Sequence, residues 1–104
     1  MVFSFIESKL FTALVEDDLT DEEYQALQAL LIEQPEAGKV IRGSGGLRKL
    51  RWRAPGRGKR SGYRVIYYVA EQDVIWMLTI YPKNVHDDIP KDVLRKIRKE
   101  IDNA

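Results

Sequence analysis

The sequence predicts an α+β fold, a compact single domain over residues 1–104 in which a mainly antiparallel sheet is flanked by helices. A chain of 104 residues, 44% of them hydrophobic, is long enough for one packed core and too short for two. Hydrophobic periodicity changes along the chain in the order strand, helix, helix, strand, strand, strand, helix. The last two strands are separated only by residues 71–73, a hairpin-length connection that favours antiparallel pairing.

The N-terminal half contributes one strand and two helices. Residues 2–7 place Phe3 and Phe5 on one side and Ile6 on the other, which suits a strand that is buried on both faces. Such a strand could be central in the sheet. Residues 10–16 predict a short helix. Thr20 and Glu23 form a capping box, and the leucines and alanines that follow predict a second helix that ends near Pro35.

The C-terminal half contributes three strands and a final helix. The glycines at 43, 45 and 46 interrupt the chain before strand-like runs at 47–53, 63–70 and 74–81. The first two runs are joined by a longer loop rich in glycine and arginine. Residues 90–102 predict an amphipathic helix, because apolar side chains recur on one stripe and basic side chains lie off it.

Charge is segregated along the chain, although the net charge is only +1. Residues 1–36 carry a local charge of −8 and residues 71–104 a local charge of −1. Residues 37–70 hold ten bases and no acid, a local charge of +10. Like charges this dense repel one another unless a polyanion neutralises them, so the segment predicts a phosphate-bearing partner. We expect the acidic helical end to face away from that partner.

Strand periodicity divides the basic segment between two faces. In the run 47–53, Leu50 and Trp52 point to the core, while Lys49, Arg51 and Arg53 point the other way, about 7 Å apart, which matches the spacing of successive phosphates. In the next run Arg64 shares a face with Tyr68, whereas Tyr67 lies on the opposite face. We expect one of these tyrosines to be a core residue with a tethered hydroxyl, and the one on the cationic face to be a base-stacking or proton-transfer candidate.

In the last strand the alternation predicts a core stripe of Val74, Trp76, Leu78 and Ile80. Tyr81 is expected on the other side, together with Thr79.

Composition excludes several kinds of chemistry. The chain has no cysteine and a single histidine, His86, so disulfides, thiolate nucleophiles and Cys-based zinc sites are excluded. We expect neither a metal nor another cofactor. The N-terminal residues do not resemble a signal peptide or a membrane span, so we expect a cytoplasmic protein without a membrane partner.

Three segments form a recognisable set: GGLRKLRW at 45–52, GRGKRSGYRVIYY at 56–68 and LTIYPKN at 78–84. They resemble the HigB-type toxins of the RelE/ParE toxin superfamily. The start of the second helix, DEEY at 21–24, is similar to that branch as well. The resemblance extends over nearly the whole chain and implies a RelE-like fold, a twisted antiparallel sheet flanked by helices in the order β-α-α-β-β-β-α.

The resemblance implies a toxin of a type II toxin-antitoxin system, a ribosome-dependent endoribonuclease (mRNA interferase) that cleaves translated mRNA and so inhibits translation. It also implies a cognate antitoxin with a DNA-binding domain that represses its own operon, and a place for mRNA in the decoding site of the ribosome. By position, the catalytic residues would be Lys49, Arg51, Arg64 and Lys83. The expected nucleic-acid-binding residues are Arg48, Arg53, Arg57, Lys59, Arg60, Tyr68, Tyr81 and Asn84.

RNA can be cleaved without a metal when its own 2′-OH attacks the adjacent phosphorus, which requires a base, an acid and cations around the phosphate. Arg51 and Arg64 suit the phosphate as permanently charged planar donors, and Lys49 is a candidate base. The acid is left open between Lys83, Tyr68 and Tyr81, with His86 as a further proton carrier. Two alternative functions remain: a ParE-like inhibitor of DNA gyrase and a non-catalytic nucleic-acid-binding module.

Overall fold

The structure is a computed structural model that describes residues 3–53, 62–84 and 89–103. Its elements are β1 (Ser4–Glu7), α1 (Lys9–Asp18), α2 (Asp21–Glu33), β2 (Lys39–Val40), β3 (Arg48–Arg53), β4 (Gly62–Ala70), β5 (Val74–Pro82) and α3 (Lys91–Asp102). The predicted order is confirmed, with the two-residue strand β2 as an addition. No described helix is long and apolar enough to cross a membrane.

The strands form one sheet in the order β1-β5-β4-β3-β2. The pairs β2–β3, β3–β4 and β4–β5 are antiparallel and β1–β5 is parallel, so the predicted mainly antiparallel sheet is confirmed. β1 lies at an edge, and the expectation of a doubly buried central strand is wrong: Ser4, Ile6 and Glu7 are exposed. The reason is topological, because the chain passes from β1 directly into α1 and no other described strand pairs with the outer edge of β1.

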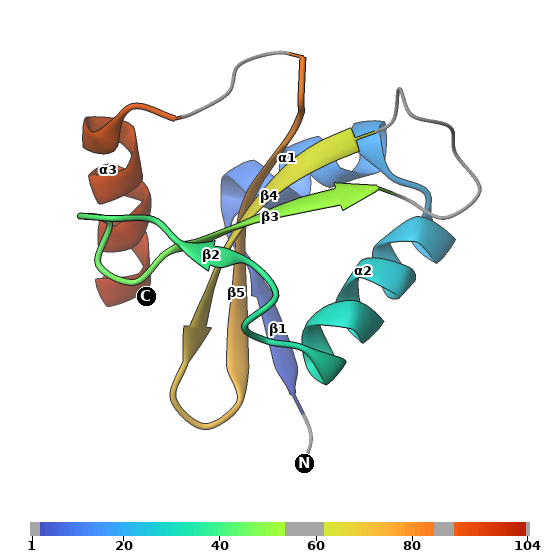
Figure 1. The fold of residues 1–104 in the computed structure, drawn as a ribbon, viewed down its shortest axis with the longest axis horizontal. Coiled ribbons are helices and arrows are strands. Elements are labelled where there is room, and N and C mark those ends of the chain that lie inside the picture. Colours follow the sequence, from blue (N-terminus) through green and yellow to red (C-terminus); the bar gives the residue numbers. More distant parts are fainter. Residues whose placement is uncertain (1–2, 54–61, 85–88, 104) are drawn as a thin grey trace.

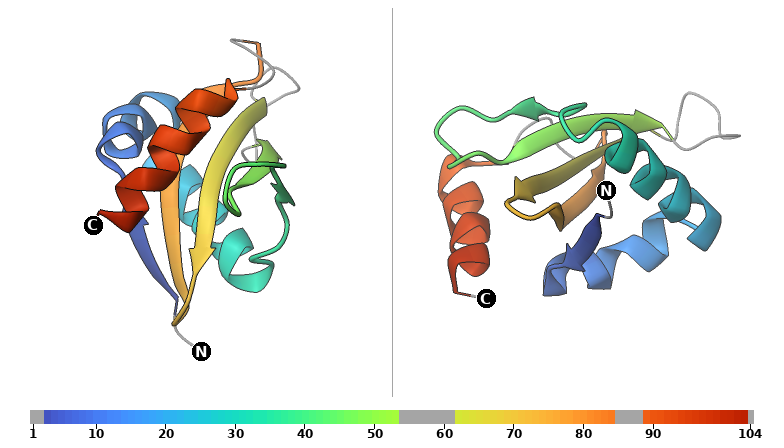
Figure 2. Two further views of the ribbon diagram at one scale, coloured as in Figure 1. Left: turned by 90° about the vertical axis from the view of Figure 1, so that its left-hand side faces the viewer. Right: turned by 90° about the horizontal axis from the view of Figure 1, so that it is seen from below.

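Each face of the sheet is covered by helix (Figures 1 and 2). The larger core lies between the sheet and the helices α1 and α2, and includes Phe11, Leu27 and Trp52. A smaller core lies under α3, where Leu94 and Ile97 meet residues of β4 and β5. We refer to these two sides as the α1–α2 face and the α3 face.

A β-bulge in β5 changes which residues share a face. The register pairs Ile66 with Thr79 but Tyr67 with Met77, so Leu78 is an extra residue without a cross-strand partner. Leu78 therefore packs on the α3 face, whereas Ile80 packs on the α1–α2 face. The predicted stripe that joined Leu78 to Ile80 is wrong, because strict alternation does not continue through a bulge. Tyr81 consequently shares the α3 face with Leu78.

Polar side chains attach the helices to the sheet. The Ser8 hydroxyl accepts the Phe11 N–H at 3.0 Å and donates to the carbonyl of Leu78 at 2.7 Å, so the N-cap of α1 is also bonded to β5. The predicted capping box at Thr20 is present at the start of α2. In α2, the Tyr24 hydroxyl donates to the Glu7 carboxylate at 2.8 Å. Burial, followed by this hydrogen bond, raises the pKa of Tyr24.

Tyr67 is the tethered core tyrosine that the sequence predicts. Its ring is fully buried on the α1–α2 face. Its hydroxyl donates to the carbonyl of Pro35 at 2.7 Å and accepts the N–H of Gly38 at 2.8 Å. Burial raises the pKa of this phenol. The tether fixes the segment that follows α2 against β4 and so positions β2 at the sheet edge.

Candidate nucleic-acid interface

The α3 face carries a series of cations where β3, β4 and β5 lie side by side. Arg51 lies opposite Arg64, and Arg64 lies opposite Tyr81 on the next strand. One row further along β3, Lys49 lies opposite Ile66. Successive rows on one face are about 7 Å apart, and directly opposed residues have Cβ atoms about 5 Å apart. The predicted alternation is confirmed, since Lys49 and Arg51 lie on the face opposite to the buried Leu50 and Trp52.

These cations are accessible and concentrated. Arg51 and Arg53 are exposed, and Arg64 is half-buried. Within the described residues, no carboxylate forms an ion pair with any of these three arginines. Like charges directly opposite one another on a sheet are destabilising, and Arg51 faces Arg64 in this way. An anion bound between them would remove the repulsion, so the pair is suited to hold a phosphate in the planar, bidentate manner of guanidinium groups.

Lys83 reaches the same surface from the turn after β5. A Cβ built on Gly62 would lie 2.9 Å from Cδ of Lys83, so the lysine stem crosses the strand where Gly62 has no side chain. Gly62 is the cross-strand neighbour of Arg53 and lies two residues before Arg64, on the same face. Lys83 thus extends the cationic surface, and the exposed Asn84 follows it in the turn. We call Lys49, Arg51, Arg53, Arg64 and Lys83 the cationic row.

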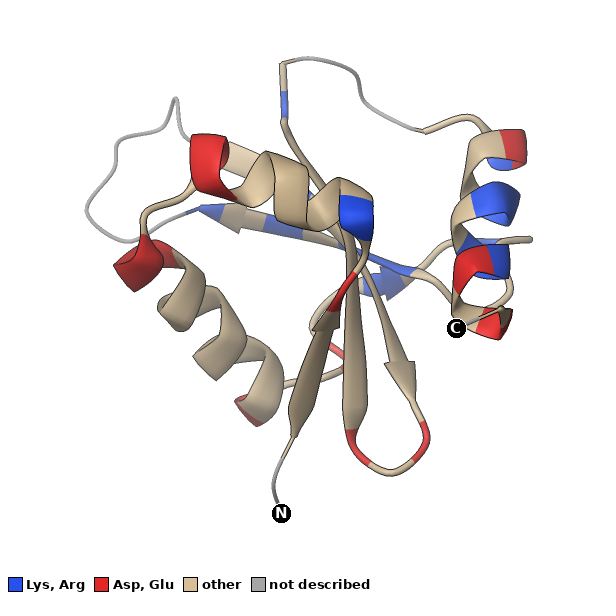
Figure 3. Ribbon diagram, turned by 180° about the vertical axis from the view of Figure 1, so that it is seen from behind, with Lys and Arg blue, Asp and Glu red and all other residues tan. Residues whose placement is uncertain are grey.

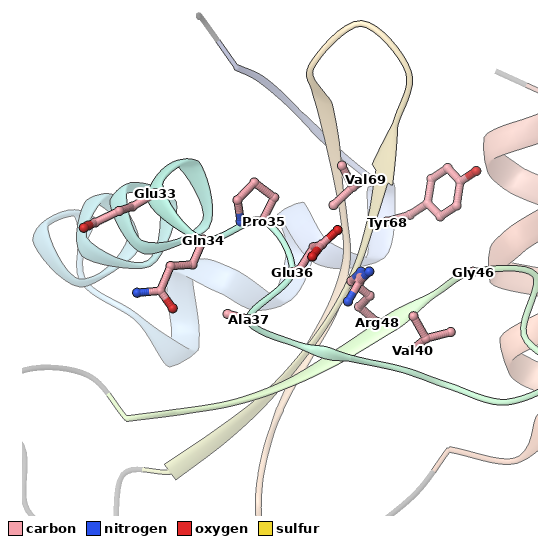
Figure 4. Close-up of a pocket in the computed structure, with 10 residues that line it drawn as sticks. All are labelled: Glu33, Gln34, Pro35, Glu36, Ala37, Val40, Gly46, Arg48, Tyr68 and Val69. Atoms are coloured by element: carbon pink, nitrogen blue, oxygen red, sulfur yellow. The ribbon is translucent and has the colours of Figure 1, made fainter.

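The structure separates Arg48 and Tyr68 from the cationic row. Arg48 begins β3 on the side of the sheet that faces the end of α2, and its Nη1 donates to the carbonyl of Gly38 at 2.7 Å. Tyr68 is on the α3 face but lies four residues along β4 from Arg64, about 13 Å away. The guanidinium of Arg98 stacks over its ring at 4.5 Å from the centroid. Both residues line a cavity of about 810 Å³ (Figure 4).

That cavity differs from the cationic row in charge. Glu33 and Glu36 both line it, Glu36 next to Arg48, and two carboxylates oppose the entry of a polyanion. Tyr81 is therefore the tyrosine that shares rows with the cations, because its strand partner is Arg64. The predicted residues Arg57, Lys59 and Arg60, together with His86, lie outside the described residues.

Acidic and basic residues are distributed unevenly over the fold (Figure 3). The acids collect where α1 ends and α2 begins, and they include Asp17, Asp18 and Glu22. β3 carries bases and no acid, whereas α3 carries both signs. The acidic junction lies on the α1–α2 face. Tyr63 donates to the carbonyl of Asp18 at 2.9 Å, so this junction lies at the same end of the sheet as Arg53. The acidic α1–α2 junction and the exposed cations of β3 thus lie on opposite faces of the sheet.

Two further cations flank the row without having been given a role from the sequence. Arg42 and Lys91 line a cavity of about 350 Å³ together with Lys49 and Tyr81. Arg42 precedes the glycine turn and Lys91 begins α3, so they are 49 positions apart in the chain. No local pattern brings such positions together, because their proximity depends on how α3 docks on the sheet.

Chemically, the cationic row can bind a phosphodiester along β3 and β4 and stabilise negative charge on its oxygens. Lysine amines at Lys49 and Lys83 lie on the same face as the arginine pair and offer groups that can exchange protons. Tyr81 is the strand partner of Arg64, but its hydroxyl oxygen is buried. The residues assigned from the resemblance as catalytic therefore come from three separate segments and share one face.

Comparison with known proteins bears on the fold. No protein-family model matches the chain. A solved structure of a mutant of the E. coli toxin RelE in its free state superimposes with a TM-score of 0.57 over 97% of this chain and 99% of that one, at 21% sequence identity. The RelE-like fold expected from the sequence resemblance is thereby confirmed: the chain has the architecture of the toxin RelE.

Proposed function

We propose that this protein is the toxin of a type II toxin-antitoxin system and that it cleaves mRNA on the translating ribosome. The observation that carries the proposal is the opposed pair Arg51 and Arg64, accessible on the α3 face of a RelE-like fold with Lys49 and Lys83 around it. Like charges on neighbouring strands repel one another, and within the described residues no carboxylate pairs with these arginines. A face that served only the stability of the fold would not be expected to gather them.

In the proposed reaction, the 2′-oxygen of the substrate attacks the adjacent phosphorus and the bond from phosphorus to the 5′-oxygen breaks. The products are a 2′,3′-cyclic phosphate and a 5′-OH. Arg64 and Arg51 hold the non-bridging oxygens, where charge increases in the transition state. A base removes the 2′-proton and an acid protonates the leaving oxygen. Lys49 is the candidate base and the exposed Lys83 is the candidate acid. The Tyr81 hydroxyl is buried, and Tyr68 is too distant.

The ribosome has a physical role in this proposal. The cationic row offers lysine amines for proton transfer and no imidazole, the side chain whose ordinary pKa lies nearest to neutral pH. Alignment of the 2′-oxygen with the phosphorus then becomes the main source of rate, and mRNA held in the decoding site supplies it. The proposal includes a cytoplasmic location, a HigB-like specificity and an antitoxin with a DNA-binding domain as the partner that silences the enzyme.

The test is to induce the protein alone in bacteria, together with Arg64→Ala and an exposed control on the outer side of α3, Lys96→Ala. We expect growth arrest and mRNA cuts phased with codons for the wild type and Lys96→Ala, and neither for Arg64→Ala. Growth arrest with DNA damage and intact transcripts would instead identify a gyrase inhibitor. Salt-sensitive RNA binding without any cleavage on ribosomes would identify a binding module.

A further inference from the structure

A second cavity adjoins the cationic row where α3 approaches the sheet. It has a volume of about 350 Å³ and is formed by three separate parts of the chain: the segment after β2, the central strands and the start of α3. A space of this size is at the lower end of the range of small-ligand pockets. It is large enough for one nucleotide.

The lining of this cavity combines cations with apolar walls. Arg42, Lys49 and Lys91 supply the charges, and no carboxylate occurs among the described lining residues. Ile41, Ile66 and Ile89 supply apolar surface. Ile66 is almost completely buried and forms part of the floor, whereas Arg42 and Lys91 are exposed at the rim. A ligand that fits must therefore combine a flat or compact apolar body with an anionic group.

The cavity is continuous with the proposed reaction site. Lys49 belongs to both, and Tyr81 lines the cavity while it lies opposite Arg64 on the neighbouring strand. The Ile66 row is two residues from the Arg64 row, which is about 7 Å and close to the distance between successive phosphates of an extended RNA strand. A strand whose phosphate lies between Arg51 and Arg64 would thus bring its neighbouring nucleotide to this opening.

We infer that this cavity is a nucleotide subsite, in which the base of the residue next to the cleaved phosphate lies against Ile66 and Ile89 and its own phosphate meets Arg42 and Lys91. The inference rests on the proposed function. It explains why two cations outside the row are placed at the start of α3 and before the glycine turn, and it makes this subsite a determinant of base preference. The cavity lined by Glu33 and Glu36 offers no comparable environment for RNA.

The test uses purified protein with isotope-labelled isoleucine methyl groups, observed by NMR. The probe is a trinucleotide with 2′-deoxyribose at every position, which cannot be cleaved, added to millimolar concentration; inorganic phosphate is added in a parallel titration. The ring current of a base should shift the methyl signals of Ile41, Ile66 and Ile89 with the trinucleotide and not with phosphate. Ile6 and Ile32, exposed on other surfaces, should not respond to either probe.

Variants separate the charges from the walls. Arg42→Ala and Lys91→Ala should each weaken trinucleotide binding about two- to fivefold, the usual effect of one exposed charge contact. Lys96→Ala, on the same helix but outside the cavity lining, should not. Ile89→Trp should fill the opening and suppress the shift at Ile66, while the matched Ile32→Trp on α2 leaves it unchanged.

The outcomes distinguish this inference from the proposed function. Shifts confined to Ile41, Ile66 and Ile89 support the subsite even if the protein proves unable to cleave mRNA. If the wild type cleaves mRNA on ribosomes but these methyl groups do not respond, or respond equally to phosphate, the inference is wrong and the proposed function stands.

Discussion

Substitution of Gly62 by alanine should lower activity while leaving the fold intact. The new Cβ would lie 2.9 Å from Cδ of Lys83, whereas ordinary contacts begin at 3.4 Å, so the lysine stem has to retreat. The retreat is about 0.5 Å at Cδ and about 1 Å at the amine. A displacement of that size in a reacting group lowers the rate by about ten- to a hundredfold. Gly62 does not have a positive φ, so alanine fits the backbone and should raise stability by up to about 1 kcal/mol.

The assay is cleavage of a defined mRNA on purified ribosomes, measured for wild type, Gly62→Ala, Lys83→Ala and the double variant, with thermal unfolding as the control for folding. If the alanine acts through Lys83, the double variant should be no slower than Lys83→Ala alone. Full activity of Gly62→Ala beside a slow Lys83→Ala would refute the placement of Lys83. Additive losses would show that the alanine acts on another group.

Three further predictions concern the tether, the buried phenol and the row. Tyr67→Phe leaves the Gly38 N–H and the Pro35 carbonyl without their partner, so it should lower the free energy of unfolding by about 1–3 kcal/mol in urea titrations; a loss below about 0.5 kcal/mol would contradict the tether. The pKa of Tyr24 is raised in the fold, so the stability that the neutral phenol contributes is complete below the unfolded pKa of about 10 and is lost as the pH rises above it. The free energy of unfolding should therefore fall less steeply with alkaline pH in Tyr24→Phe than in the wild type. An unchanged slope would show that Tyr24 does not cause the alkaline loss of stability. Arg53→Ala should reduce the salt dependence of single-stranded RNA binding by about 0.7 in logarithmic slope, and Lys99→Ala on α3 should not; equal slopes for wild type and Arg53→Ala would remove Arg53 from the interface.

Local patterns in the sequence predicted the elements and the cationic face well. Alternation in β3 is sufficient to predict that Trp52 is buried in the core and Arg51 is exposed, because successive side chains of a strand point to opposite faces of the sheet. The capping box of α2 and the helical stripe of α3 depend on spacings of three and four residues, and both are present.

The remaining features depend on interactions between distant segments. The bulge at Leu78 arises from pairing with β4, and no residue in β5 marks it in advance. The adjacent apolar residues Phe5 and Ile6 predict a strand that is buried on both faces, but β1 is the edge strand of the sheet. β2 has only two residues, too few for a periodicity signal.

The sequence placed Tyr68 with the RNA-binding residues because it shares a strand face with Arg64, and Arg48 because it lies in the basic run that the resemblance covers. The carbonyl of Gly38 and the guanidinium of Arg98 engage them at the other end of the sheet, and neither contact has a local signature.

If the cationic row promotes attack by the 2′-OH of the RNA itself, the chemical ends of the RNA fragments reveal it. The most direct measurement therefore identifies the ends of mRNA fragments produced on programmed ribosomes. For the wild type, we expect a 2′,3′-cyclic phosphate on one fragment and a 5′-OH on the other, and no cleavage above background for Arg64→Ala. Intact mRNA with the wild type, fragments that carry a 5′-phosphate, or equal cleavage by Arg64→Ala would contradict it.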